Sequence, residues 1–331
     1  MFSFTVVATT GERFSDFAPY VASVNDAGTV AFQAALRVGG SGVFAGVGGE
    51  VVELVRQSLH AGVTSHPDLN DAGDTSFYGE LPRGGQGVFL RRDGRLHVVS
   101  DTHGAFASIG PLGPTMNEAG TVAFRADSAD RVSGIFAGDG AAVTTVADTS
   151  GPWSRFHGLP VITDDDTVVF RADCKDGVQR IYAGRGGSIR TVAETGERFA
   201  SLGLFPSANE GGTVAFAATL RGGGAGIFTD DDGRITRVTE AEGAFEAYRG
   251  ALITNAGAVV MIATPRGASL GLFGGPDPEA DRILALGDSL FGSTVEDFAA
   301  NPVSVNASGQ VAIRARLADG RHVVLRADPA R

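Results

Sequence analysis

The chain has 331 residues, of which 43% are apolar, so it is long enough and apolar enough to bury a substantial core. Its formal net charge is −11 at pH 7, which argues against a nucleic-acid backbone or an anionic membrane as the main partner, because both attract basic surfaces. Its only cysteine, Cys174, excludes a disulfide within the chain, and the N-terminus lacks the pattern of a signal peptide. We therefore expect a cytoplasmic protein, or a secreted one if a leader was removed.

A short phrase recurs along the chain at a nearly constant interval. It reads NDAGTVAF from residue 25, NEAGTVAF from residue 117, NEGGTVAF from residue 209 and NASGQVAI from residue 306. Two degenerate copies carry threonine at its first position. The aligned positions, which are 45–52 residues apart, are Asn25, Asn70, Asn117, Thr163, Asn209, Thr254 and Asn306. A fixed period of this length is typical of repeat architectures.

Each copy contains four short segments with the composition of β-strands. In the fifth copy they are residues 204–209, 212–220, 225–231 and 234–240, separated by turn sequences rich in Asn, Asp and Gly. Val214 and Phe216 alternate with Ala215 and Ala217, so both faces of this sheet are apolar and neighbouring copies must cover them. A four-stranded antiparallel unit of this period is typical of a propeller blade.

The two ends of the chain complement each other. The last copy stops before a fourth strand, whereas residues 2–8 form a surplus strand before the first copy. Moreover, VATTGERF (7–14) matches VAETGERF (192–199), which ends the fourth copy. We therefore expect residues 2–8 to pair with residues 321–327. The prediction is an all-β protein, a single domain over residues 1–331, folded as a seven-bladed β-propeller whose ring the N-terminal strand closes.

The NxxG turns and the VAF phrases resemble those of bacterial proteins with NxxGxxxF-type tandem repeats, which are expected to form β-propellers. The resemblance covers nearly the whole chain. The motif specifies the shape of a blade, and the resemblance implies no activity.

A candidate binding site follows from the placement of the first strand in each copy. Pro67, Pro114, Pro160 and Pro206 lie in it, and proline belongs on an edge strand because it has no N–H, so this strand should be innermost. Four to six residues before each aligned position, these strands should begin around the mouth of the channel. Most copies carry Gly, Ala, Leu or Phe there, but several carry polar groups. The predicted ligand-binding residues are Tyr20, His66, Asp68 (just inside), His157, Tyr248, Arg249 and Asn301.

The favoured function is a recognition module that holds a small molecule, glycan or peptide at this mouth, as a monomer and without a cofactor. No histidine pair has metal-site spacing, so no metal is predicted. One alternative is a cofactor-free lyase, isomerase or hydrolase with His66 or His157 as acid or base and Arg249 holding a carboxylate, which requires all three within about 3 Å of the reacting atoms. Another is a scaffold that docks proteins on its blade rims.

The segment ALGDSLFG (285–292) looks like the nucleophile block of the SGNH esterases. Ser289 would be the nucleophile, His322 the base and Asp319 its orienting carboxylate. That family needs an α/β sandwich and a much longer interval between these residues. The repeat explains the segment as a connection between two copies, and we favour that interpretation.

Overall fold

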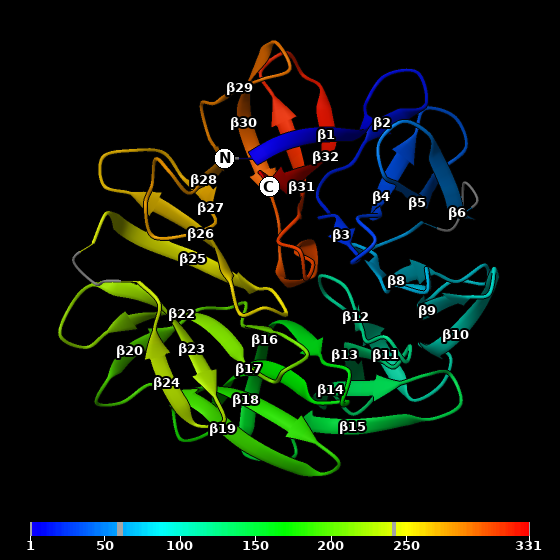
Figure 1. Cartoon of the computed structure of the whole chain (residues 1–331). Helices are drawn as coiled ribbons and strands as arrows, with labels where there is room; N and C mark the ends of the chain where they lie inside the picture. Colours follow the sequence, from blue (N-terminus) through cyan, green and yellow to red (C-terminus); the bar gives the residue numbers. More distant parts are fainter. Residues whose placement is uncertain (1, 58–61, 240–242, 331) are drawn as a thin grey trace.

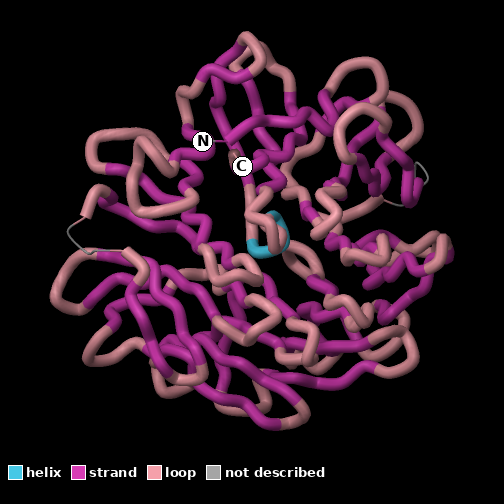
Figure 2. Tube along the Cα trace, in the orientation of Figure 1, coloured by secondary structure: helices cyan, strands magenta, loops and turns pink. Residues whose placement is uncertain are grey.

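The computed structural model describes residues 2–57, 62–239 and 243–330, and its strands form seven antiparallel sheets around a central axis (Figure 1). Strands and loops make up nearly all of this part of the chain, with a short helical turn near the centre (Figure 2). Among the described residues, no helix is long and apolar enough to cross a membrane. The predicted seven-bladed propeller is confirmed.

The first four blades follow the chain from the N-terminal side. Blade 1 contains β2 (Phe14–Asp16), β3 (Ser23–Val24), β4 (Val30–Leu36), β5 (Ser41–Gly46) and β6 (Val51–Gln57). Blade 2 contains β7 (Asp68–Leu69), β8 (Thr75–Glu80), β9 (Gln86–Arg92) and β10 (Arg95–Asp101). Blade 3 contains β11 (Phe106–Ile109), β12 (Thr115–Met116), β13 (Val122–Ser128), β14 (Ser133–Gly138) and β15 (Val143–Asp148). Blade 4 contains β16 (Trp153–Ile162), β17 (Val168–Cys174), β18 (Gln179–Arg185) and β19 (Ser188–Glu194).

The last three blades complete the ring. Blade 5 contains β20 (Phe199–Leu202), β21 (Ser207–Ala208), β22 (Val214–Leu220), β23 (Ala225–Asp231) and β24 (Arg234–Arg237). Blade 6 contains β25 (Phe245–Ile253), β26 (Val259–Pro265), β27 (Gly271–Phe273) and β28 (Arg282–Ala285). Blade 7 contains β29 (Ser289–Leu290), β30 (Ser293–Ala299), the 3-10 helix η1 (Pro302–Ser304), β31 (Val311–Leu317), β32 (His322–Pro329) and β1 (Phe2–Thr9).

The core lies between neighbouring blades, as the alternation along the strands predicts. Phe216 of β22 stacks on Phe228 of β23, with ring centroids 5.8 Å apart, and both pack toward blade 4. Ala215 and Ala217, on the other face of β22, pack against Phe245 and other residues of blade 6. Large aromatic side chains on one face and small ones on the other let adjacent sheets approach closely.

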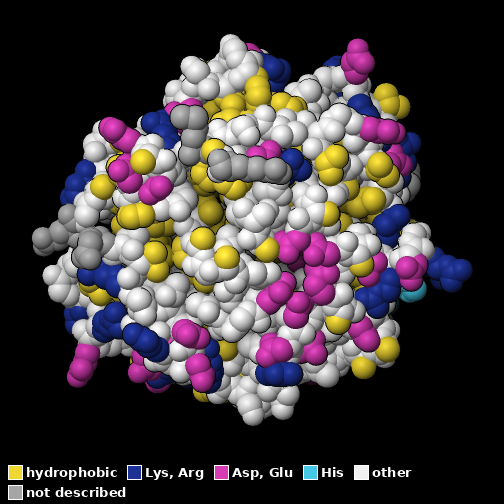
Figure 3. Space-filling view, in the orientation of Figure 1, with side chains coloured by type: hydrophobic (Ala, Val, Ile, Leu, Met, Phe, Trp, Pro, Cys, Tyr) yellow, Lys and Arg dark blue, Asp and Glu magenta, His cyan; other side chains and the backbone are white. Residues whose placement is uncertain are grey.

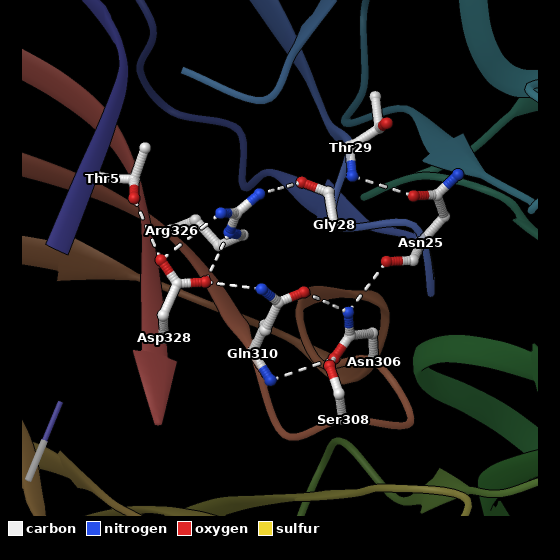
Figure 4. Close-up of polar contacts among 9 residues, drawn as sticks. All are labelled: Thr5, Asn25, Gly28, Thr29, Asn306, Ser308, Gln310, Arg326 and Asp328. Carbon is white, nitrogen blue, oxygen red and sulfur yellow. Dashed lines mark hydrogen bonds and ion pairs between the residues drawn. The ribbon is translucent and has the colours of Figure 1, made fainter. Parts of the chain in front are cut away.

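The ring closes through strand β1, which pairs with β32 in antiparallel register from Phe2–Pro329 to Thr9–Val323. Polar contacts join this seam to blade 1 (Figure 4). The Asp328 carboxylate accepts hydrogen bonds from the Thr5 hydroxyl at 3.0 Å and from Arg326 Nε at 2.6 Å, and Arg326 Nη1 donates to the carbonyl of Gly28. The terminal strands therefore hold blades 7 and 1 together, as the sequence predicts.

Asparagine side chains link the turns of successive blades around the axis. Asn25 Nδ2 donates to the carbonyl of Asn70 at 3.1 Å, and Asn306 Nδ2 closes the series by donating to the carbonyl of Asn25 at 2.9 Å. Equivalent bonds run from Asn117 to Thr163 and from Asn209 to Thr254. Each asparagine Oδ1 also accepts the N–H four residues ahead, which fixes its own turn. We call this set the asparagine ladder.

Two local expectations differ from the structure. The innermost strand of the fifth copy extends outward as β20, where Phe199 is buried against Phe216 and Phe228, and it is interrupted over residues 203–206 before β21. Residues 302–306 of the last copy correspond to the strand expected at 204–209 in the fifth copy, but they contain η1 instead. Its start is fixed because the Asn301 side chain accepts from the N–H of Val303 at 3.1 Å and Pro302 needs no N–H partner.

The asparagine ladder can be tested at Asn306, which is buried. Asn306→Thr keeps the bond within the turn, as Thr254 does with the N–H of Ala258, but removes the bond to Asn25. Asn306→Ala removes both. We expect losses in the free energy of unfolding of about 1 kcal/mol for threonine and about 2–3 kcal/mol for alanine, measured by urea denaturation. A threonine variant as stable as the wild type would show that the bond between blades contributes nothing.

Candidate functional site

A cavity of about 420 Å³ opens where the innermost strands begin, at the end of the channel opposite the asparagine turns. We call it the mouth cavity. Residues from the windows predicted in all seven copies line it, and the wall is mostly apolar. Its main apolar residues are Val21, Leu112, Leu159, Phe205, Leu270 and Phe298. A concave, largely apolar space with a few polar groups is the usual form of a small-molecule site.

Four of the seven predicted residues meet in the mouth cavity: Tyr20, His66, Arg249 and Asn301. Tyr20 is half-buried, and burial raises the pKa of its hydroxyl, so it is a neutral hydrogen-bonding group. Arg249 is exposed at the rim and brings a positive charge to a wall that is otherwise apolar. The cavity can therefore accept an apolar body together with an acceptor or anionic group.

His66 is neutral and has a fixed orientation. Burial lowers its pKa to about 4, and its ring lies so close to Gly113 that a Cβ there would fall 2.5 Å from a ring carbon. The amide of Asn301 is oriented by the N–H of Val303, which leaves Nδ2 facing His66 Nε2 at 3.5 Å. Because an amide NH₂ can only donate, Nε2 is the acceptor and the proton lies on Nδ1.

Asp68 lies at the other end of the channel, in a cavity of about 140 Å³ beside the turns, which we call the turn-end cavity. Its Oδ1 accepts from the N–H of Leu69 at 2.9 Å, and its Oδ2 accepts from the N–H of Met116 in the next blade at 2.7 Å. Burial nevertheless raises the pKa of Asp68 to about 7. Ser207 is the equivalent residue of blade 5, and its hydroxyl accepts from the N–H of Ile253 in the next blade. A serine hydroxyl can therefore make the bond to the next blade that the Asp68 carboxylate makes with Met116.

The remaining two predicted residues do not line the mouth cavity. His157 Nε2 lies 2.7 Å from Asp173 Oδ2, and Arg171 pairs with the other oxygen of that carboxylate at 3.0 Å. Burial lowers the pKa of His157 even though Asp173 opposes the shift. Tyr248 packs on Phe245 in the core of blade 6, with ring centroids 5.7 Å apart. His66, His157 and Arg249 are therefore not gathered around one cavity.

The lining residues that the predicted set lacks are the apolar ones. Leu112, Leu159 and Phe205 occupy the same sequence windows as the predicted polar residues, so the repeat could have identified them. Leu270 and Phe298 come from the connection before β27 and from β30, outside any such window. Their place depends on how blades 6 and 7 pack, which the repeat pattern does not encode.

Acidic side chains gather around a hollow near the middle of the face drawn in Figure 3. The residues that follow the aligned positions and line the turn-end cavity include Asp26, Asp71, Glu118, Asp164 and Glu210. Each of the first four accepts a backbone N–H from the preceding blade, as Asp71 does from Asp26 at 2.7 Å. Within the described ranges, no three His, Cys, Asp or Glu side chains are placed to hold a metal ion.

The esterase-like triad is not formed. His322 Nδ1 lies 2.6 Å from Asp16 Oδ1 of blade 1, while the Asp319 carboxylate accepts from Arg321 Nε at 2.8 Å. Ser289 is an exposed residue of the short strand β29. Asp319 therefore does not orient His322, and the segment serves as a connection between blades 6 and 7.

The fold and the mouth cavity together define a seven-bladed propeller with a pocket at one end of its axis. Residues 4–131 match DUF7453, a family of unknown function. No curated protein matches the chain.

Solved structures with the same architecture include enzymes. An oligogalacturonate lyase in complex with manganese matches 100% of this chain and 96% of its own, with a TM-score of 0.62 and 13% identity. An oligogalacturonate lyase from Vibrio parahaemolyticus matches 99% and 97%, with a TM-score of 0.60 and 11% identity. A puromycin-hydrolyzing peptidase from Mycobacterium tuberculosis matches 94% of this chain and 51% of its own, with a TM-score of 0.55 and 14% identity. At these identities the similarity shows the fold alone.

The raised pKa of Asp68 predicts a specific pH dependence. A carboxyl whose pKa is higher in the folded than in the unfolded state stabilises the fold below the unfolded value of 3.8, and that contribution is lost as pH rises through about 7. Asp68→Ser, which copies Ser207, removes the buried charge. We expect it to raise the free energy of unfolding by about 1–3 kcal/mol at about pH 8 and to have little effect at about pH 4.

His66 titrates in the opposite sense, because its lowered pKa makes stability fall as pH drops from 6.5 through about 4. Because His66 is present in both proteins, its contribution cancels when the free energy of unfolding of the wild type is subtracted from that of Asp68→Ser at the same pH. Denaturant titrations of both proteins at several pH values measure this difference. A difference that does not change with pH would contradict the raised pKa.

Proposed function

We propose that this chain is a recognition protein that holds a small amphipathic molecule in the mouth cavity. The observation that carries the proposal is the cavity itself, about 420 Å³ in volume, where an apolar wall meets Tyr20, His66, Arg249 and Asn301. This volume lies within the usual range for ligand pockets, about 300–1,000 Å³. The ligand would place its apolar part against the wall and an anionic or acceptor group beside Arg249.

Binding is favoured over catalysis because, among the described residues, His66 alone brings an imidazole to the mouth cavity. His66 Nε2 already accepts from Asn301 Nδ2, and His157, the second histidine of the enzymatic alternative, is held by Asp173 outside the cavity. A glycan or a peptide end remains compatible with the cavity. The enzyme and scaffold alternatives, the monomeric state and the cytoplasmic location stay predictions, and we infer from the asparagine ladder that the repeats are of the NxxGxxxF type.

The proposal can be tested with anilinonaphthalene sulfonate, a fluorescent probe with an apolar ring system and one anionic group. We expect saturable one-to-one binding to the folded protein. Val21→Trp places a large side chain in the mouth cavity and should weaken binding at least about tenfold. Val38→Trp, at a site that is 86% exposed and remote from the cavity, is the matched control.

The charge contribution is tested separately with Arg249→Gln. We expect it to weaken binding of the sulfonate probe about tenfold, equivalent to about 1.4 kcal/mol, whereas Arg95→Gln at the exposed start of β10 should have no effect. Fluorescence titration measures the dissociation constant of the probe for each variant. If Val21→Trp and the wild type bind the sulfonate probe with equal affinity, the proposal is contradicted, because the probe must then bind outside the mouth cavity.

A further inference from the structure

A second cavity, of about 470 Å³, lies next to the mouth cavity over blades 2 and 3. We call it the side cavity. Two residues, Tyr20 and Leu112, line both cavities and form the wall between them. The two spaces are therefore neighbouring compartments at the same end of the propeller, separated by two side chains rather than by a blade.

The side cavity has a different chemistry from the mouth cavity. Its polar lining includes Thr64, Tyr78, Gln86, Ser108 and Asp127. The Asp127 carboxylate accepts from the Ser108 hydroxyl at 2.8 Å and from the Ser133 hydroxyl through its other oxygen. Each carboxylate oxygen has a further lone pair, so Asp127 can still accept hydrogen bonds from a ligand.

Two donors accompany this acceptor. Gln86 Oε1 accepts from the N–H of Ile109 at 3.2 Å, which orients the amide and leaves Nε2 with two N–H groups to donate. The Tyr78 oxygen accepts from the N–H of Arg125 at 3.2 Å, which leaves its proton to be donated, and burial raises the pKa of Tyr78 so that it keeps this proton. A lining that both donates and accepts suits hydroxyl groups, whereas Asp127 would repel an anion.

The wall itself shows an unusual feature. Leu112 has a φ of +79°, a left-handed conformation that costs free energy for a leucine. Its side chain is 38% exposed, so burial in the core does not account for this conformation. Leu112 lines both cavities, so a molecule that crossed from one cavity to the other would touch this apolar side chain.

We propose that one ligand occupies both cavities and is a glycoside with an apolar aglycone. The aglycone lies in the mouth cavity, crosses Leu112 and Tyr20, and places its sugar in the side cavity against Gln86 and Asp127. This inference rests on the proposed function, since it requires the mouth cavity to bind an apolar group. It adds the class of the ligand and the residues that recognise its polar part.

The test measures displacement of anilinonaphthalene sulfonate by octyl glycosides of glucose, galactose, mannose and N-acetylglucosamine, each below its micelle-forming concentration. Octanol, which is the aglycone without the sugar, is the reference competitor. We expect at least one glycoside to compete at least about tenfold more tightly than octanol, because only the glycoside can fill the side cavity.

The decisive variant is Gln86→Glu. It keeps the oxygen that accepts from Ile109 but replaces the donating NH₂ with a carboxylate oxygen. Gln179→Glu is the matched control, because Gln179 braces Leu202 N–H at the same 3.2 Å distance in blades 4 and 5 and lines neither cavity. We expect Gln86→Glu to weaken the best glycoside about tenfold while affinity for the sulfonate probe and for octanol stays unchanged.

The outcomes separate the two proposals. If the probe binds in the mouth cavity but no glycoside exceeds octanol, or if Gln86→Glu weakens the glycoside no more than Gln179→Glu does, the side cavity is not a sugar site and the proposed function survives. If the probe does not bind, or Val21→Trp leaves its binding intact, both proposals are overturned.

Discussion

The asparagine ladder is the constraint on which the rest of the structure depends. Each link joins a side chain of one turn to the backbone of the next, and the bond from Asn306 to Asn25 joins the last blade to the first. These bonds hold blades 7, 1, 2, 3 and 4 together and blade 5 to blade 6, whereas the side chains of Thr163 and Thr254 bond within their own turns. The β1–β32 seam applies the same constraint at the outer side of blade 7. The openings at both ends of the channel are therefore set by contacts that lie outside the mouth cavity.

This arrangement separates structural from variable positions along a single strand. The turn end of the innermost strand repeats nearly the same residues in each blade, and in the five blades with asparagine at the aligned position its side chain donates to the backbone of the next blade. At the other end of this strand, the residues that line the mouth cavity differ from blade to blade. In chain order they are Tyr20, His66, Leu112, Leu159, Phe205, Arg249 and Asn301. A sevenfold framework thus surrounds an asymmetric cavity, which is what discrimination between small molecules requires.

Sequence periodicity could predict the framework because the repeat and the packing share one cause. The alternation of Phe216 with Ala215 and Ala217 indicates that both faces of the sheet are buried, as the structure shows. It could not predict which polar side chains reach the cavity. His157 falls in the right window, but Asp173 of the neighbouring strand, two residues from the register partner Arg171, holds it. The sequence could not predict the side cavity for a similar reason, since Gln86 of β9 and Asp127 of β13 line one space only after blades 2 and 3 pack.

The electrostatics of the channel bear on which molecules can enter each end. Six carboxyl groups line the turn-end cavity, Asp68 among them, and burial together with mutual repulsion raises the pKa of Glu118 and Glu210. Anions are therefore disfavoured there, whereas Arg249 favours them at the mouth cavity. The ring of His66 is neutral and its Nε2 accepts from Asn301 Nδ2, so His66 adds no charge to the mouth cavity. A ligand with an acidic or acceptor group would consequently approach from the mouth, and its orientation would be fixed by Arg249 before the apolar wall is reached.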